Sequence, residues 1–470
     1  MLTRRKLLQS VALTVAGMGV ATLASCQPAV VKETVVVEKV VKETVVVEKA
    51  AAIVTIRHML RAGDLGPRYD RAIVEFSNSH PDMKAKIEPV PGGDVEYVPK
   101  MMAMHAAGTI GDSCWTSIGS VNHYQYADMG ITTPLDELIS ETGYDSSVFY
   151  ESSWESSKYQ GKVYGLPECS HPGTAMLVYN KTLFEAEGVE EPDDTWTLDK
   201  LLEVAKYFTR DTKGDGRIDT WGFNPSTGRL IVMLIRCFSG YEYDMLNPDG
   251  TKAMVNQPKT KEALAWVSDL YQKHQVTPTP EAMEMGFNQL FMAGRVAMFQ
   301  TGCWGGPGLS NAMKAKREFP MEWWCAPLPK GPSGVLGSHA EVDCQCVTTL
   351  SKHKQAAFDF IGYLVDKEGA VLRGLPYGCA GSRKDQYEDP RLQGTLFTKD
   401  DKALFAIYDM LNAKAGPYFY PANLQGQQAF QVYTQGLQPL WLGKAEPTDA
   451  FFDDVNKQLQ TVLDKPKAGA

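Results

Sequence analysis

The sequence predicts an α/β protein of two lobes, each built on a mostly parallel sheet flanked by helices. Apolar strands alternate with amphipathic helices, as where "IVTIRHML" (53–60) is followed by "YDRAIVEFSNSHPD" (69–82). This alternation is typical of parallel sheets with helical crossovers. The chain has 470 residues, and a single core rarely grows beyond about 300 residues. We therefore expect two lobes rather than one.

Later segments extend the same pattern. A helix capped by Thr197 is expected where apolar residues share one face, at Leu198, Leu201, Leu202 and Ala205. The same spacing predicts a second helix through Ala357, Phe360, Ile361 and Leu364. "RVAMFQ" (295–300) predicts a buried strand, and the glycine-rich "TGCWGGPG" that follows it predicts a turn.

Residues 1–25 have the features of a secretory signal peptide. Three basic residues precede an apolar run (7–23), which polar residues and two glycines interrupt. The run ends in Leu-Ala-Ser-Cys at 23–26, which resembles the lipobox of bacterial lipoproteins. The alternative is an ordinary cleavage site before a cysteine. We expect a lipid on Cys26 that anchors the protein outside the cytoplasm to the cell membrane, with either Sec or twin-arginine export.

A tandem repeat, "VVKETVVVEK" twice at 30–49, follows the cysteine. Two copies cannot build a core, so residues 26–51 are interpreted as a stalk. The whole chain carries a formal charge of −9, and loss of three basic residues with the signal makes the body more acidic, at −12. An acidic body argues against a nucleic-acid partner. No second stretch is long and apolar enough to span a bilayer.

The sequence lacks the common motifs of enzymes, cofactor sites and metal sites. The sequence has no Gly-x-Ser-x-Gly, no His-Glu-x-x-His and no P-loop, and its eight histidines have no metal-ligand spacing. Besides Cys26, eight cysteines remain, and these form either disulfides or buried thiols. "DTKGDGRIDTWGF" (211–223) places Lys213 and Gly222 where a calcium loop needs oxygen ligands, so we interpret it as a turn.

One long segment carries a family resemblance. Gly161–Phe208 contains Gly-Leu-Pro at 165–167, Tyr-Asn-Lys at 179–181 and Thr-Trp before a helix at 195–196. Other matching pieces occur along the chain in the expected order, namely "AAGTIGDSCW" (106–115), "FMAGRVAMFQTGCW" (291–304), "APLPKGPSG" (326–334) and "LSKHKQAAFDFIGYL" (350–364). Together they resemble the bacterial extracellular solute-binding proteins of the maltose-binding-protein-like type. A glycine, Gly111, stands where that family usually has a proline.

The resemblance implies a monomeric receptor that captures a sugar or related solute between its lobes. It would deliver this solute to the permease of an ATP-binding-cassette importer, without a cofactor or catalysis. Three chain crossings are expected, near 168–174, 336–342 and 366–372. Lobe 1 would then comprise 53–170 plus 341–368, and lobe 2 would comprise 171–340 plus 369–465. A carbohydrate-active enzyme with an acidic cleft and a ligand-free envelope lipoprotein stay open as alternatives.

Sugar recognition needs aromatic rings for the apolar ring faces and polar side chains for the hydroxyls. In α/β sheets such groups lie beyond the carboxyl ends of strands. Candidates chosen in this way are Arg61, Asp64, Trp115, Glu168, His171, Arg229, Trp304, Glu341, Asp343, Tyr418, Tyr420 and Phe430. Trp304 is the foremost, and we expect it to face Trp115 from the opposite lobe. The alternatives are a core role for Trp115, a hinge role for His171, a surface role for the loop residues, and packing roles for two of the last three aromatics.

Overall fold

The computed structural model describes residues 53–466, except 63–65, 93, 121, 307, 310–320, 375–380 and 394–399. The signal, Cys26, the stalk, Asp64 and Cys379 therefore lie outside the described residues. Within the described part of the chain, every helix is too short or too polar to cross a membrane.

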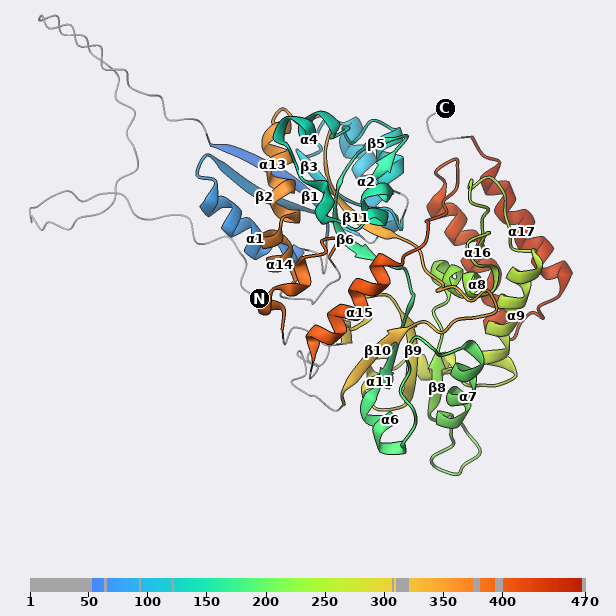
Figure 1. Ribbon diagram of the computed structural model, residues 1–470. Coiled ribbons are helices and arrows are strands. Elements are labelled where there is room, and N and C mark those ends of the chain that lie inside the picture. Colours follow the sequence, from blue (N-terminus) through green and yellow to red (C-terminus); the bar gives the residue numbers. More distant parts are fainter. Residues whose placement is uncertain are drawn as a thin grey trace, which may run out of the picture. The chain divides into compact units, whose positions relative to one another are not determined.

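The first sheet has five strands in the order β2-β1-β3-β11-β6 (Figure 1). Their bounds are β1 (Val54–Arg61), β2 (Met83–Val90), β3 (Ser113–Ser117), β6 (Leu166–His171) and β11 (Glu341–Val347). β1 pairs in parallel with β2 and β3, whereas β11 runs antiparallel to both of its neighbours.

The second sheet has four strands in the order β10-β7-β9-β8. Their bounds are β7 (Met176–Asn180), β8 (Trp221–Asn224), β9 (Val296–Thr301) and β10 (Trp323–Pro327). β7 runs antiparallel to β9 and β10, and β8 is parallel to β9. A separate hairpin pairs β4 (Lys158–Tyr159) with β5 (Lys162–Val163).

In each sheet a single strand opposes the direction of the others, and that strand is the first one after the chain changes sheets. The chain leaves the carboxyl end of β6 and enters the second sheet as β7; it later leaves the carboxyl end of β10 and returns as β11. A short link from one carboxyl edge reaches only the facing edge of the other sheet, so the entering strand must run backwards. The carboxyl edges of the two sheets therefore face each other across the links.

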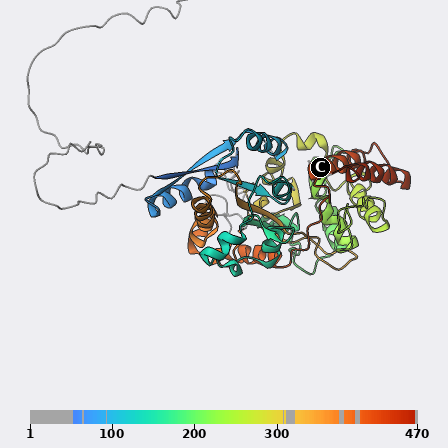
Figure 2. The ribbon, with the colours of Figure 1, turned by 90° about the horizontal axis from the view of Figure 1, so that it is seen from above.

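Helices cover both sheets. Those associated with the first sheet are α1 (Gly66–Ser79), α2 (Asp94–Ala106), α3 (Asn122–Asp128), α4 (Asp136–Thr142), α5 (Glu151–Ser156), α13 (Lys354–Val365) and α14 (Lys367–Gly374). Those on the side of the second are α6 (Lys181–Glu187), α7 (Leu198–Phe208), α8 (Val232–Ser239), α9 (Pro258–Gln272), α10 (Pro280–Met283), α11 (Phe287–Met292), α15 (Asp401–Ala413), α16 (Gly426–Trp441) and α17 (Asp449–Leu463). Short 3₁₀ turns are η1 (Ser146–Val148), η2 (Gly228–Ile231), η3 (Gln386–Glu388) and η4 (Pro390–Leu392). Figure 2, seen from above, also shows the first group on one side and α16 and α17 on the other.

Each face of the second sheet has its own hydrophobic core. In β7, Leu177 and Tyr179 belong to one buried cluster, and Val178 between them belongs to the other. This division follows from the two-residue period of a strand, which points successive side chains to opposite faces. The first sheet has a third cluster, in which α13 packs against β1, β3, β6 and β11.

The structure confirms the elements expected from periodicity. The Thr197 hydroxyl accepts a hydrogen bond from the Lys200 amide at 3.2 Å and caps α7. The expected strand at 295–300 is β9, displaced by one residue. The expected helix at 69–82 is α1, which ends before His80 as predicted but starts three residues earlier.

Candidate functional site

The carboxyl edge of the first sheet gathers several of the predicted residues. β1 ends at Arg61, β6 ends at His171, and the antiparallel β11 begins at Glu341, so all three lie at the same edge. The corresponding edge of the second sheet includes the end of β9, and Trp304 lies in the turn just beyond it. Strand order thus brings together side chains that lie up to 280 positions apart in the sequence.

Trp304 contacts His171 between the two sheets. The indole and imidazole rings meet edge to face, with centroids 5.3 Å apart and an interplanar angle of 84°. Trp304 is partly exposed, whereas His171 is buried. An aromatic ring that keeps one part open beside a polar side chain is the arrangement that carbohydrate recognition requires.

Glycine at 302 permits this placement of Trp304. A Cβ atom at Gly302 would lie 2.1 Å from Cζ3 of the indole ring, so any larger residue would displace the ring. Gly305 and Gly306 similarly make room for Thr301 and Trp323. The glycines of this turn therefore make room for neighbouring side chains of the protein.

Two carboxylates of β11, those of Glu341 and Asp343, lie near His171 at the end of β6. Asp343 Oδ2 lies 3.8 Å from His171 Nε2. Glu341 pairs directly with His171 in the sheet register, and its Oε2 lies 3.2 Å from His339 Nε2. Burial lowers the pKa of His339, and the neighbouring Glu341 partly offsets that effect. Glu341 also fills the space beside Gly119, where a Cβ would lie 1.9 Å from Oε1.

The aromatic residues of the C-terminal segment lie beside this cluster. Tyr418 donates a hydrogen bond to the Gly119 carbonyl at 3.0 Å and meets the His339 ring edge-on at 4.6 Å. Tyr420 stacks on Tyr124 of α3, with centroids 4.4 Å apart. Phe430 packs near Tyr433 at 5.9 Å and lines a cavity of about 20 Å³ that is too small for a sugar. Tyr418 is thus the member of this group nearest to the carboxylates.

Trp115 occupies a different position from the one expected. It lies in the middle of β3 rather than beyond its end, and only 3% of its surface is exposed. Its ring meets Tyr97 edge-on at 5.8 Å, and the Arg61 guanidinium lies 5.4 Å from the ring centroid. The serine and glycine residues on either side of Trp115 in the sequence are themselves buried, so Trp115 packs in the core of the first sheet beside Arg61.

Glu168 is committed to neighbours within the protein. Its carboxylate accepts hydrogen bonds from the Tyr69 hydroxyl, from the Arg373 guanidinium and from the Gln345 side-chain amide. Glu168 and Arg373 are both buried. These bonds tie β6 and β11 to α1 and α14, and they leave little of the carboxylate for a solute. Asp64 and the side chain of Arg229 lie outside what the structure describes; the Arg229 backbone belongs to η2.

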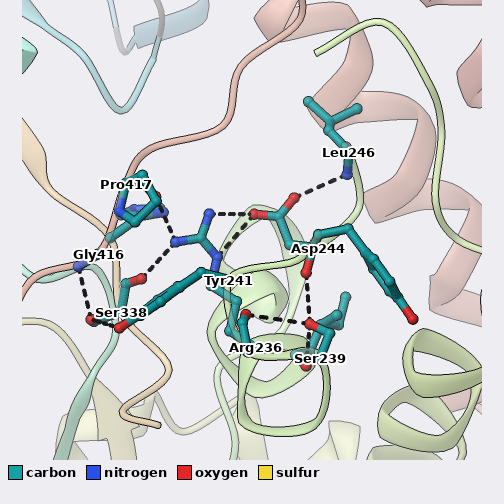
Figure 3. A network of polar contacts seen from close by, with 12 residues as sticks. Arg236, Ser239, Tyr241, Asp244, Leu246, Ser338, Gly416 and Pro417 are labelled. Atoms are coloured by element: carbon teal, nitrogen blue, oxygen red, sulfur yellow. Dashed lines mark hydrogen bonds and ion pairs between the residues drawn. The ribbon is translucent and has the colours of Figure 1, made fainter. Parts of the chain in front are cut away.

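A buried arginine beside the site was missed by the sequence reasoning. Arg236 of α8 donates through Nε and Nη2 to Asp244 Oδ2 at 3.1 and 2.7 Å. Its Nη1 donates to the carbonyls of Ser338 and Pro417 at 2.6 and 2.7 Å (Figure 3). The available signal was a lone charge within the apolar stretch "LIRCF" (234–238). A charge in such a place needs buried partners.

Arg236 thereby organises the links between the sheets. The two links between the sheets are hydrogen-bonded to each other, because His339 N donates to Pro172 O at 3.3 Å. Ala340 N also donates to Gly416 O, in the segment between α15 and α16, at 2.8 Å. Three passages of the chain therefore lie side by side, and the guanidinium holds two of them against α8.

The loop at 211–219 is closed by its own hydrogen bonds. The Asp211 carboxylate accepts from the backbone amides of residues 213, 214, 215 and 216, and Asp219 accepts from Thr212. These backbone hydrogen bonds hold the pKa of Asp211 below its usual value. An aspartate that accepts amides in this way forms a turn, as the sequence indicated. The seven cysteines of the described residues are all thiols.

Comparison with known proteins gives a consistent result. The family model for bacterial extracellular solute-binding proteins matches residues 71–406. A putative binding protein of Brucella abortus is 26% identical over 406 residues, covering 85% of this chain and 90% of that protein. An uncharacterized ABC transporter extracellular-binding protein of Pyrococcus horikoshii is 23% identical and covers 71% and 73% of the two chains.

Solved structures share the fold. An ABC substrate-binding protein from Listeria monocytogenes in complex with cycloalternan superposes with a TM-score of 0.72 at 21% identity, covering 87% of this chain and 99% of that one. Maltose-bound MalE3 of T. maritima gives 0.69 at 21% identity, covering 87% and 100%. The fold is thus the two-lobed fold of periplasmic binding proteins. With a family match over most of its length, this chain belongs to the bacterial extracellular solute-binding proteins.

Proposed function

We propose that the protein captures a carbohydrate between its two lobes and delivers it to the permease of an ABC transporter. The observation that carries this proposal is the contact of Trp304, beyond β9 of one sheet, with His171, at the end of β6 of the other. The sugars named for the solved structures and the transporter named for the Pyrococcus relative support the same reading.

The groups near this contact suit a polyhydroxylated ligand. The open part of Trp304 offers an apolar surface for the C–H face of a sugar ring. His171, Asp343, Glu341 and Tyr418 provide hydrogen-bonding groups within the same region. Carboxylates are well suited to neighbouring hydroxyls, because their two oxygens can accept hydrogen bonds from two hydroxyls at once. Trp115 and Glu168 are not included, because both are occupied inside lobe 1.

Binding is coupled to closure of the lobes in this proposal. A solute that contacts both lobes only when they are closed shifts the population from open to closed. The Arg236 network keeps the link before β11, at Ser338, fixed to α8, so the change in angle falls on the residues between that anchor and the first sheet.

A melting-shift screen of the purified protein tests this function. The panel contains mono- and oligosaccharides, polyols and phosphorylated polyols. A ligand at about 100 times its Kd should stabilise the protein by roughly 2.7 kcal/mol. A sugar that raises Tm in a saturable manner supports the proposal, and a flat response across the carbohydrates contradicts it and favours a ligand-free envelope role.

A second assay separates a receptor from a glycosidase. We propose that the protein performs no catalysis, although paired carboxylates near a sugar site also occur in glycosidases. Any stabilising oligosaccharide is incubated with the protein and the products are separated by size. A receptor returns the ligand intact, whereas shorter products would establish hydrolysis.

We also propose how the chain divides into lobes and that it acts as a monomer. Lobe 1 consists of residues 53–170 plus the segment from residue 341 to the end of α14. Lobe 2 consists of residues 171–340 plus the part of the chain that follows α14. The third crossing expected at 366–372 is better placed after α14, because α14 packs on α1 and α13 beside the first sheet. Light scattering of the purified protein tests the monomer.

The N-terminal segment is proposed to anchor the protein by a lipid on Cys26. The Leu-Ala-Ser-Cys motif after a signal-length apolar run motivates this proposal. Cys26→Ser should release the body from the membrane fraction into a soluble fraction. Membrane association that persists in this variant would contradict the anchor.

A further inference from the structure

Three side chains of the kind that ligate metals converge on one face of the β6–β11 pair. Cys169 and His171 lie two residues apart on β6, and Asp343 of β11 pairs directly with Cys169 across the sheet. Residues two apart in a strand share a face, as do residues directly opposite in neighbouring strands. Consequently the Cys169 sulfur, a His171 ring nitrogen and an Asp343 oxygen all lie within 4.8 Å of one another.

The spacing is close to that of a bound zinc ion. Bond lengths of about 2.0–2.3 Å place neighbouring ligand atoms of a tetrahedral site about 3.3–3.6 Å apart. His171 Nε2 and Asp343 Oδ2 lie 3.8 Å apart, before any rearrangement around an ion. The three ligand atoms, all within 4.8 Å of one another, would move closer together around the ion.

The ligand set selects the kind of metal. A thiolate, an imidazole and a carboxylate fit Zn²⁺ and related transition metals, whereas Ca²⁺ and Mg²⁺ require oxygen ligands. The thiolate and the carboxylate together balance a divalent charge. This matters because Cys169 and His171 are buried, and an uncompensated charge would be costly there.

The surroundings hold these ligands in position. The backbone of Cys169 also forms an isolated antiparallel β-bridge with Gly381, so β6 has a backbone partner on both sides at this residue. The Trp304 ring packs edge-on against His171 and restricts the imidazole. Groups that orient ligands in this way raise metal affinity.

We propose that Cys169, His171 and Asp343 form a site for a divalent transition metal, with Zn²⁺ as the best-fitting ion. Three protein ligands leave a fourth position for water or for an oxygen of a bound solute. The site goes beyond the receptor function and does not depend on the solute being a sugar. Because His171 and Asp343 are also proposed solute contacts, metal and solute should influence each other's affinity.

The test uses the full chain, stripped of metal by a chelator and kept reduced with a phosphine. Zn²⁺ alone is titrated by calorimetry, and Co²⁺ alone is titrated by absorption. One equivalent should bind, and Co²⁺ should produce a sulfur-to-metal charge-transfer band. Cys169→Ser should abolish the band and weaken Zn²⁺ binding by more than about 100-fold, since loss of an outer-shell partner alone costs 10–100-fold.

Two further variants complete the experiment. Cys237→Ser removes an equally buried thiol on α8 and should leave both the band and the affinity unchanged. Asp343→Asn should keep the band but weaken affinity, which gives a second readout if Cys169→Ser does not fold. The proposal is overturned if the reduced protein takes up neither ion saturably, or if the band survives Cys169→Ser. The metal titrations contain no sugar, and the carbohydrate screen uses metal-free protein. Failure of the metal proposal can therefore be distinguished from failure of the proposed function.

Discussion

The Trp304 indole stands edge-on to the His171 imidazole, with ring centroids 5.3 Å apart. One residue follows β9 in the second sheet, and the other ends β6 in the first. The contact therefore joins the facing carboxyl edges of the two sheets, where ligands of open α/β folds bind.

Trp304→Ala is expected to weaken solute binding by about 2 kcal/mol or more, roughly thirtyfold. The reason is that the ring is partly exposed at the proposed cleft. Unfolding free energy without ligand should change far less than the approximately 3–5 kcal/mol of a core tryptophan. A ligand titration and a denaturant melt measure the two effects.

The matched control for this substitution is Trp441→Ala, which removes a partly buried tryptophan at the end of α16. It should leave affinity unchanged. Normal binding by Trp304→Ala together with much lower stability would instead make Trp304 a packing residue.

Arg236→Met is expected to lower the unfolding free energy by about 3–5 kcal/mol, because it leaves the Asp244 carboxylate buried without its cation. The double variant Arg236→Met/Asp244→Asn should recover part of that loss. Arg210→Met, which breaks the exposed pair with Glu187, should cost much less, because solvent screens that pair. Urea denaturation of the unmodified protein and the three variants measures these free energies of unfolding. Equal decreases for the buried and the exposed pair would argue against the buried network.

Gly119→Ala should destabilise the protein by about 1–3 kcal/mol, since the new Cβ would lie 1.9 Å from Glu341 Oε1. Glu341 is buried and cannot swing into solvent without breaking its contact with His339. Solute affinity should fall as well. Gly362→Ala in α13, where the nearest atom is 3.8 Å away, should be neutral or stabilising. Thermal melts of both variants give the comparison, and a neutral Gly119→Ala would show that Glu341 moves freely.

Stability should depend on pH through His58. Full burial lowers the pKa of His58 from 6.5 to about 3, because the charged ring has no access to water. The unfolded chain binds this proton near pH 6.5 and the folded chain only near pH 3. Above pH 6.5 His58 is neutral in both the folded and the unfolded state and therefore costs no stability. As the pH falls from 6.5 towards 3, the free energy of unfolding decreases by about 1.4 kcal/mol per pH unit.

Urea titrations at pH 6, 5 and 4 test this dependence by comparison with His58→Gln. The variant should be less stable at pH 7, since it disturbs packing against Tyr69 and Phe360, but its stability should fall less steeply on acidification. Carboxylates titrate in both proteins, so the difference between the two slopes reports His58. Parallel curves would exclude it as a source of acid sensitivity.

Local order was within reach of the sequence. Apolar residues at helical spacing and a Thr197 cap located α7, and a run of apolar residues located β9, because these elements are stabilised by neighbours a few residues away. The turn at 211–219 was likewise expected from residue types alone, and the Asp211 carboxylate accepts hydrogen bonds from amides up to five positions away. The two-lobed fold followed from chain length and from the order of family motifs.

Only the tertiary structure decided which distant residues meet. Trp115 was expected at the cleft but packs in a core, because its exposure depends on Tyr97 and Arg61 rather than on its sequence neighbours. The partners of Arg236, and the convergence of Cys169 and His171 with Asp343, depend on strand register and on which strand follows each crossing. The contacts of Arg236 with Ser338 and Pro417, and of Cys169 with Asp343, span more than a hundred residues in sequence. They are set by how whole strands and helices pack, which local residue patterns do not encode.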